Sequence, residues 1–306
     1  ARQKDTLAAP QDLATKYSHP QPLVDCLRAS MDEETLEAFL AADNDIPKTA
    51  LQANPLKASA EQVAAALDEA GIACEPHPWL PGCFLVSGTG NLESLPLFQS
   101  GAVYVQDAAA KLAVLASGTA PGMRVLDCCA APGGKSFAMA EKMQGKGSVT
   151  SCDIYEHKLK RIRDGAARLG LPNIRTELQD ASVCREEWKD SADVVLCDVP
   201  CSGLGIIRKK PEIRFKNPDE IRTLPEIQAR ILANCAQYVK KGGTLVYSTC
   251  TILQRENEDV VRAFLTENPE FEAVSWTHPV CGERADGMVT LLPPVHNTDG
   301  FFIAKM

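Results

Sequence analysis

The stretch Asp127-Cys-Cys-Ala-Ala-Pro-Gly-Gly-Lys-Ser136 decides how the rest of this sequence is interpreted. It follows a short apolar run, Arg124–Cys128, and precedes a helical pattern over 136–143, so it predicts a tight turn between a buried strand and a helix. Small residues and two glycines let the backbone approach a ligand closely, and the N-terminus of the following helix carries partial positive charge. The turn is therefore a candidate ligand-binding loop.

Two better-known loops are excluded by spacing. A phosphate-binding Gly-x-x-x-x-Gly-Lys-Ser loop needs a glycine at position 129, which is a cysteine here. The dinucleotide pattern Gly-x-Gly-x-x-Gly is absent from the turn as well. An ordinary strand-to-helix turn remains the alternative.

Apolar runs alternate with helical patterns on both sides of this loop, which predicts a parallel, doubly wound sheet. The expected strands are Arg124–Cys128, Ser148–Asp153, Ile174–Leu178, Asp193–Asp198 and Thr244–Ser248, with closing strands at Phe271–Trp276 and Phe301–Lys305. The expected helices between and after them cover 136–143, 156–169, 219–239 and 256–266.

The first hundred residues have a different pattern, helix-rich with a few short strands. Glu33–Ala42 and Ala60–Ala70 have helical apolar spacing, and Gly71 follows at a plausible helix end. We expect a small α+β domain over residues 1–100 and a larger α/β domain over 101–306.

Composition excludes several classes of protein. The chain has 306 residues, of which 45% are hydrophobic and 24% charged, which is ordinary for globular proteins and unlike disordered or fibrous ones. No apolar run is long enough to span a membrane. Twelve cysteines without a Cys-x-x-Cys pair favour reduced thiols in a cytoplasmic protein over a disulfide scaffold or a zinc ribbon, so we expect no metal.

The net charge of −8 argues against a nucleic-acid partner only at first sight. Residues 1–100 hold 6 basic and 14 acidic residues, so the rest of the chain is neutral overall. Within that part, 156–175 and 203–222 are locally basic, the second through residues that include Lys209 and Lys210. Such patches can neutralise phosphates on an acidic protein, although a solvated helix face explains 156–175 equally well.

Acidic residues and cysteines mark the other strand ends. Asp153 ends the second strand, where a carboxylate can accept both ribose hydroxyls, and Asp180 follows the third, where it could bind an adenine amino group or cap a helix. Cys201 and Cys250 come just past the fourth and fifth strands, which are usually neighbours. Both thiols should enter one crevice, as a nucleophile with a helper thiol or, less well supported, as a redox pair. Other cysteines, namely Cys152, Cys197 and Cys235, are expected to be buried and apolar in character.

These strings resemble the signature motifs of the S-adenosylmethionine-dependent RNA (cytosine-5)-methyltransferases, and further runs resemble the branch that modifies RNA of the small ribosomal subunit. The motifs are Asp127–Ser136, Asp198–Gly203, Ser248–Thr251, Val105–Ala108, Gly205–Phe215, Arg255–Glu258 and Asp299–Ala304. The resemblance implies a Rossmann-like, mostly parallel sheet of seven strands and an RNA-binding N-terminal domain. Members of that branch also begin with a helical NusB-like domain, which we expect this chain to lack.

The resemblance also implies roles for individual residues. S-adenosylmethionine would lie on the loop Cys129, Ala130, Ala131, Pro132, Gly133, Gly134 and Lys135, with Asp153 at its ribose, Asp180 near its adenine and Asp198 beside it. Cys250 would attack C6 of cytosine, Cys201 would help to remove the C5 proton, and Asp198 would polarise the ring. The expected partner is RNA, most of all ribosomal RNA, with an unpaired or flipped target base.

Two other functions stay open. A transfer RNA cytosine-5 methyltransferase would share the same core motifs. A non-catalytic RNA-binding or ribosome-assembly factor could keep the fold, but it would have no use for both Cys201 and Cys250.

Overall fold

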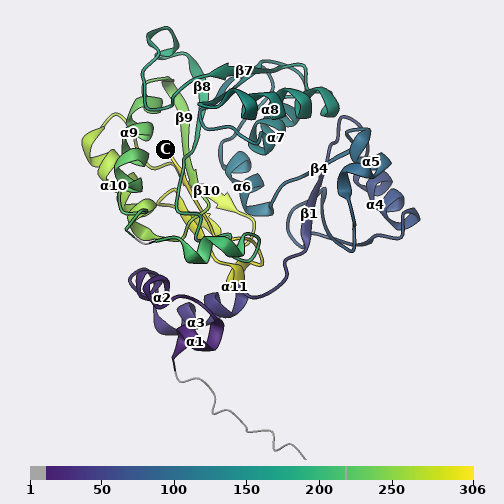
Figure 1. The fold of residues 1–306 in the computed structure, drawn as a ribbon. Coiled ribbons are helices and arrows are strands. Elements are labelled where there is room, and N and C mark those ends of the chain that lie inside the picture. The colour runs from purple at the N-terminus through teal and green to yellow at the C-terminus, as the bar shows by residue number, and fades with distance from the viewer. Residues whose placement is uncertain (1–11, 218) are drawn as a thin grey trace, which may run out of the picture.

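The computed structural model describes residues 12–217 and 219–306 and has a seven-stranded sheet at its centre (Figure 1). The strand order is β12-β13-β9-β8-β5-β6-β7, with β5 to β9 parallel and β13 antiparallel to both of its neighbours, β9 and β12. This confirms the predicted Rossmann-like, doubly wound sheet of seven strands. The strands are β5 (Arg124–Asp127), β6 (Ser148–Asp153), β7 (Ile174–Leu178), β8 (Ala192–Asp198), β9 (Val239–Thr249), β12 (Met288–Leu291) and β13 (Phe301–Lys305).

Helices cover both faces of this sheet (Figure 1). Their apolar sides form two buried clusters, one on each face, because a parallel sheet must be covered on both sides. The helices of one face are α6 (Ala108–Ala116), α7 (Gly134–Lys142) and α8 (Glu156–Leu169), and those of the other are α9 (Leu224–Ala236) and α10 (Glu258–Glu267).

The N-terminal part has two pieces. Three short helices pack through their leucines and Phe39 on loops of the large domain, against residues such as Leu204 and Ile252. A four-stranded antiparallel sheet, in the order β2-β3-β1-β4, follows and packs against α4. The helices are α1 (Leu13–Tyr17), α2 (Gln21–Arg28), α3 (Glu33–Ala42), α4 (Ala60–Glu69) and α5 (Pro96–Gln99), and the strands are β1 (Thr49–Ala53), β2 (Ala73–Pro76), β3 (Cys83–Ser87) and β4 (Val103–Val105). The small sheet thus takes in β4, just past the expected boundary at residue 100, and residues 1–11 of the expected domain lie outside the described residues.

A buried polar contact joins the small sheet to the large domain. The Asn54 side chain is fully buried and donates to the carbonyl oxygens of Gly101, at 3.0 Å, and of Leu169 at the end of α8, at 2.9 Å. Arg168 donates to the carbonyl oxygens of Phe98 and Val103 and lies over the Phe98 ring. These contacts fix the position of the small sheet relative to α8.

The structure corrects two segments predicted from the sequence. Phe271–Trp276 is not a closing strand: Phe271 packs on Phe264, and only Trp276 enters a short strand, β10 (Trp276–His278), paired with β11 (Gly282–Arg284). The helix expected over 219–239 begins at Leu224 instead. Short 3-10 turns cover Leu92–Ser94, Glu186–Trp188, Pro211–Phe215 and Gln254–Glu256, and a short helix, α11, covers Pro293–His296. Among the described residues, no helix has the length and apolar character needed to cross a bilayer.

Candidate active site

Three neighbouring strands of the sheet, β5, β8 and β9, end at the same edge, and the loops that leave them form the candidate site. Asp127 at the end of β5 pairs with Leu196, and Asp198 at the end of β8 pairs with Ser248. The chain turns in opposite directions from β5 and β8, which makes the crevice beyond their ends a topological switch point, where ligands bind in such sheets. The predicted ligand loop and both predicted thiols leave the sheet here.

The loop after β5 has the conformation that its glycines predict. Gly133 adopts a left-handed backbone with φ of 109° at the N-terminus of α7, and a Cβ atom there would come within 2.6 Å of the Phe137 ring. Asp127 accepts a hydrogen bond of 2.6 Å from Ser136, and burial raises the pKa of Asp127 to about 7. The loop is thereby held with its backbone close to the crevice.

Lys135 of this loop turns toward Asp198 and connects the predicted cofactor loop with the predicted catalytic residues. Its Nζ donates to Asp198 Oδ2 at 2.7 Å, while Ser248 Oγ donates to Oδ1 at 2.8 Å. Burial works against the charge of Lys135, but the Asp198 carboxylate outweighs it and raises the pKa of Lys135 above its ordinary value. The carboxylate of Asp198 is thus fixed in position, with its charge balanced by one ammonium group.

The two predicted thiols lie together. Cys201 Sγ and Cys250 Sγ are 3.3 Å apart. The hydrogen bond from Cys201 lowers the pKa of Cys250, and nearby Lys135 adds to this effect. The same hydrogen bond, followed by burial, raises the pKa of Cys201 well above its ordinary value. Of the two thiols, Cys250 is therefore the one that loses its proton more readily.

The loops that carry the thiols are braced against each other. Gly205 N donates to the Cys250 carbonyl oxygen at 3.0 Å, and Ser202 Oγ lies 2.7 Å from Thr251 Oγ1. A side chain at Gly205 would come within 2.1 Å of the Gly300 carbonyl oxygen, so only glycine allows this close approach. Glu256 is fully buried and accepts from Ser202 N at 2.9 Å. Sequence analysis missed Glu256 as a supporting residue, although it lies in a motif that the family resemblance had marked.

Asp153 and Asp180 lie side by side at the ends of β6 and β7. Gln179 N donates to the Asp153 carbonyl oxygen at 3.2 Å, and the Asp153 side chain is largely buried. Asp180 accepts from the hydroxyl and the N–H of Ser182, which together lower its pKa, and a turn follows it instead of the helix that it might have capped.

A pocket beside these carboxylates has apolar walls that sequence analysis missed. Ile154 and Leu178 are more than half exposed there, as is Val183, and the pocket also includes Gln179 and Asp180. Exposed apolar side chains can pack on the two faces of a flat aromatic ring such as adenine, and Asp153, the carboxylate predicted to bind ribose, is adjacent. The sequence signal for this pocket was Ile154, an apolar residue directly after Asp153 at the end of its strand.

The basic stretches are largely neutralised by the protein itself. In 156–175, Lys160 pairs with Asp164 and Arg163 with Glu156, which favours the solvated helix face. In 203–222, the Lys209 ammonium group lies 2.7 Å from Asp107 and 2.6 Å from Asp299, so these two carboxylates balance its charge. The pattern of charges along the chain gave no sign of these two distant partners.

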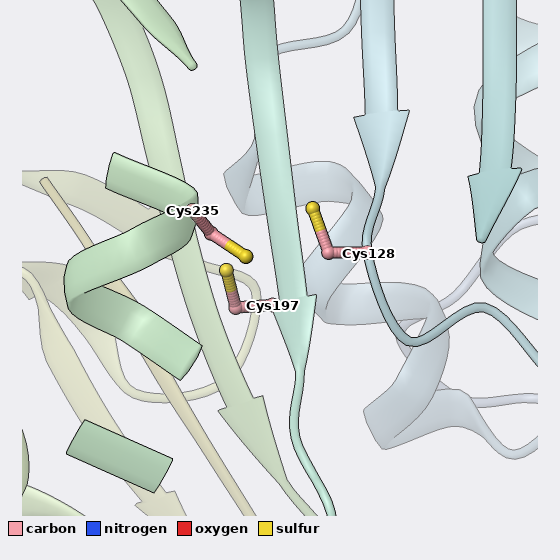
Figure 2. A group of neighbouring side chains, drawn as sticks. All are labelled: Cys128, Cys197 and Cys235. Atoms are coloured by element: carbon pink, nitrogen blue, oxygen red, sulfur yellow. The ribbon is translucent and has the colours of Figure 1, made fainter. Parts of the chain in front are cut away.

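Three further thiols form a cluster behind the site. Figure 2 shows Cys128, Cys197 and Cys235 pointing toward one another from the end of β5, from β8 and from α9. Their sulfur atoms lie within 4.8 Å of one another, and all three side chains are buried. A hydrogen bond with Cys128 and burial raise the pKa of Cys197 well above its ordinary value. Burial confirms the core role predicted for Cys197, Cys235 and Cys152, while the absence of a bound metal stays a prediction.

Comparison with known proteins identifies the family to which this site belongs. A family model described as 16S rRNA methyltransferase RsmB/F matches residues 115–306, and a model of the ferredoxin-like domain of such methyltransferases matches residues 19–93. The chain is 40% identical over 302 residues to the probable ribosomal RNA small subunit methyltransferase B of Bacillus subtilis, covering 96% of this chain and 67% of that protein. It is 34% identical over 310 residues to the enzyme of that name from Klebsiella pneumoniae, covering 100% and 70%.

Solved structures agree with this result. The crystal structure of PH0851 superposes with a TM-score of 0.92 at 31% identity and covers 99% of this chain and 69% of that one. The structure of NSun6 from Pyrococcus horikoshii with SFG has a TM-score of 0.82 at 20% identity, covers 94% and 97%, and supports the fold alone. Sheet order, crevice and relatives together define an RNA methyltransferase of the kind that uses S-adenosylmethionine. The chain belongs to the RsmB/F family of 16S rRNA methyltransferases. It spans about two thirds of the length of these relatives.

Proposed function

We propose that this protein methylates C5 of a cytosine in ribosomal RNA through a covalent bond between Cys250 and C6 of the base. The observation that supports the proposal most strongly is the 3.3 Å contact between Cys201 and Cys250, with the pKa of Cys250 lowered. C5 of cytosine is a poor nucleophile unless a thiolate first adds to C6, so a thiol with a lowered pKa at this edge of the sheet suits the reaction.

Asp198 orients the base. Its carboxylate, held by Lys135 and Ser248, accepts a hydrogen bond from the exocyclic amino group beside N3. This contact fixes the ring so that C6 faces the Cys250 thiolate. The electrons of the C5–C6 double bond then reside on C5, which takes the methyl group.

S-adenosylmethionine supplies the electrophilic methyl group when it is bound. The residues that fit it are the backbone of the loop from Cys129 to Lys135, the Asp153 carboxylate for the ribose hydroxyls, and the apolar walls Ile154 and Leu178 for the adenine. Asp180 lines the same pocket and would bind the adenine amino group in this arrangement.

Cys201 changes its protonation during the cycle for an electrostatic reason. The hydrogen bond to Cys250 is the main cause of its raised pKa, and that bond loses its charged acceptor once Cys250 becomes a thioether. The Cys201 proton is then free to pass to solvent, and the resulting Cys201 thiolate takes the proton from C5. Elimination of Cys250 from C6 restores the double bond and releases methylated RNA.

Nucleoside mass spectrometry tests the proposal. Purified protein, S-adenosylmethionine and transcribed 16S rRNA should yield 5-methylcytidine, and Cys250→Ala should yield none. Parallel reactions with transfer RNA test the other substrate class. Binding of RNA by the wild-type protein without methylation of either RNA would contradict the proposal and favour a non-catalytic factor.

A further inference from the structure

Phe215 is the most exposed aromatic side chain among the described residues. It ends the 3-10 turn Pro211–Phe215, and 74% of it is accessible to solvent. Burying a phenylalanine side chain stabilises a protein by about 1.5–3 kcal/mol. Because the Phe215 ring is exposed, it adds little of this free energy to the stability of the fold. An exposed ring of this kind indicates a surface that another molecule covers.

The backbone on both sides of the ring is held firmly. Arg214 donates to the Ser18 carbonyl oxygen at 3.2 Å and to Asn44 Oδ1 at 3.3 Å, which ties the turn to the N-terminal helices. Lys216 Nζ donates to the Ser202 carbonyl oxygen at 2.6 Å. Because both neighbours are anchored, the Phe215 ring is presented to solvent from a fixed position.

This position lies beside the two thiols. The Lys216 contact reaches Ser202, the residue after Cys201, and Ser202 Oγ lies 2.7 Å from Thr251 Oγ1, next to Cys250. Ile213, on the same turn, is buried within 3.2 Å of the place where a side chain on Gly203 would begin. The turn that carries Phe215 therefore forms part of the rim of the candidate active site.

The charges around the ring favour a nucleic acid as the covering molecule. Lys210, just before the turn, is exposed and forms no ion pair with any described residue, and the side chain of Lys216 is also cationic. The same turn also carries the exposed Glu212, so the stretch is not uniformly cationic. An exposed aromatic ring with lysines nearby in the chain is typical of surfaces that bind unpaired nucleotides, since every nucleotide has a base with a π-face and a phosphate. A base that is taken out of its stack also leaves its neighbours without stacking partners.

We propose that Phe215 stacks on the unpaired base next to the target cytosine and thereby holds the RNA strand in register with Cys250. This inference rests on the proposed function, because it places the target base against Cys250, beside Cys201. Phe215 acts as a substrate-positioning residue and takes no part in bond formation. Stacking is tolerant of sequence, so the ring contributes affinity and position but little choice of base.

Variants at this position give the first test. Phe215→Ala should weaken binding of 16S rRNA by about five- to hundredfold, the range measured when one base-stacking aromatic is removed, whereas Phe215→Trp should keep wild-type affinity. Val295→Ala, which truncates another strongly exposed apolar side chain, is the matched control and should bind normally. Affinity for S-adenosylmethionine should not change in any of the three variants, which shows that the site remains folded.

A fluorescent base gives the second test and locates the contact. In a short RNA with 2-aminopurine beside the modified cytosine, wild-type protein and Phe215→Trp should quench the fluorescence on binding, and Phe215→Ala should not. Equal affinity and equal quenching by Phe215→Ala would overturn the inference. Loss of binding to whole 30S subunits with normal binding to naked RNA would also overturn it, because the ring would then contact a ribosomal protein.

Failure of the inference can be told apart from failure of the proposed function. If wild-type protein makes no 5-methylcytidine, the proposed function is wrong and the inference falls with it. If wild-type protein makes 5-methylcytidine and Phe215→Ala makes it with an unchanged KM for RNA, only the role of Phe215 is wrong.

Discussion

The sulfur atoms of Cys201 and Cys250 lie 3.3 Å apart although 49 residues separate them in the chain. The contact follows from the sheet, because β8 and β9 are parallel neighbours with Asp198 opposite Ser248. Cys250 directly follows β9, Cys201 comes shortly after the end of β8, and the Gly205 to Cys250 backbone hydrogen bond draws the two loops together. Within this pair the pKa of Cys250 is lowered and that of Cys201 is raised.

We expect Asp153 to contribute strongly to cofactor affinity. Asp153→Asn should weaken S-adenosylmethionine binding by roughly tenfold or more in calorimetry, because a charged hydrogen bond is worth about 1.5–3 kcal/mol. Asp164→Asn, at an exposed aspartate on α8, is the control and should bind normally. Normal affinity in a folded Asp153→Asn protein would remove this carboxylate from the cofactor site.

Lys209 and Lys210 should behave in opposite ways although they are adjacent. Lys210→Ala should weaken RNA binding and lower the slope of log affinity against log salt by about 1, as for the loss of one phosphate contact. Lys209→Ala should lower the melting temperature and leave the slope unchanged, because its ammonium group pairs with Asp107 and Asp299. A salt slope that responds to Lys209 and not to Lys210 would contradict this assignment.

The reactivity of Cys250 should depend on Cys201. The pKa of Cys250 is lowered from an ordinary value of 9.0, mainly by the hydrogen bond from Cys201, so alkylation of Cys250 should begin at a lower pH than for a free thiol. In Cys201→Ala the midpoint should rise, because the thiolate loses its main stabilising contact. Peptide mapping after iodoacetamide treatment at a series of pH values measures both, with Cys184, outside the site, as the internal reference. A midpoint that stays constant or falls would show that Cys201 does not stabilise the thiolate.

Asn54 should stabilise the junction between the small sheet and α8. Asn54→Ala leaves two buried carbonyl oxygens without their donor, and one unsatisfied buried group costs about 1–3 kcal/mol. We expect the melting temperature to fall by several degrees. Leu56→Ala, two residues further on at an exposed side chain, should melt like the wild type. Equal melting of both variants would mean that the junction is held by other contacts.

Much of the catalytic domain could be predicted from sequence, because its strands are short apolar runs that end in unusual residues. The loop after β5, the strand ends at Asp153 and Asp198, and the two thiols all follow this rule, and α8 has the predicted bounds of Glu156–Leu169. In such a sheet, strand order follows from connection rules, so residues at strand ends can be brought together without a structure.

The rest depended on contacts between distant segments, which leave no periodic signal. From the sequence, Lys209 is a candidate phosphate contact. The structure shows its ammonium group paired with Asp299, which lies 90 residues later in the chain. The sequence did not predict the strand β12, because Met288–Leu291 is only four residues long. The apolar run Phe271–Trp276 was predicted as a closing strand instead. The direction of the Lys135 side chain is another example. It is set by Asp198 at the end of β8, which is distant in sequence.

Covalent capture of RNA by the two cysteine variants tests the central claim most directly. Each variant is mixed with 16S rRNA and S-adenosylmethionine and analysed by denaturing electrophoresis. If Cys250 forms the bond and Cys201 helps to break it, Cys201→Ala should give a protein–RNA band that persists under denaturing conditions, and Cys250→Ala and the double variant should give none. A band from Cys250→Ala instead, or methylation without any band from Cys201→Ala, would contradict the mechanism.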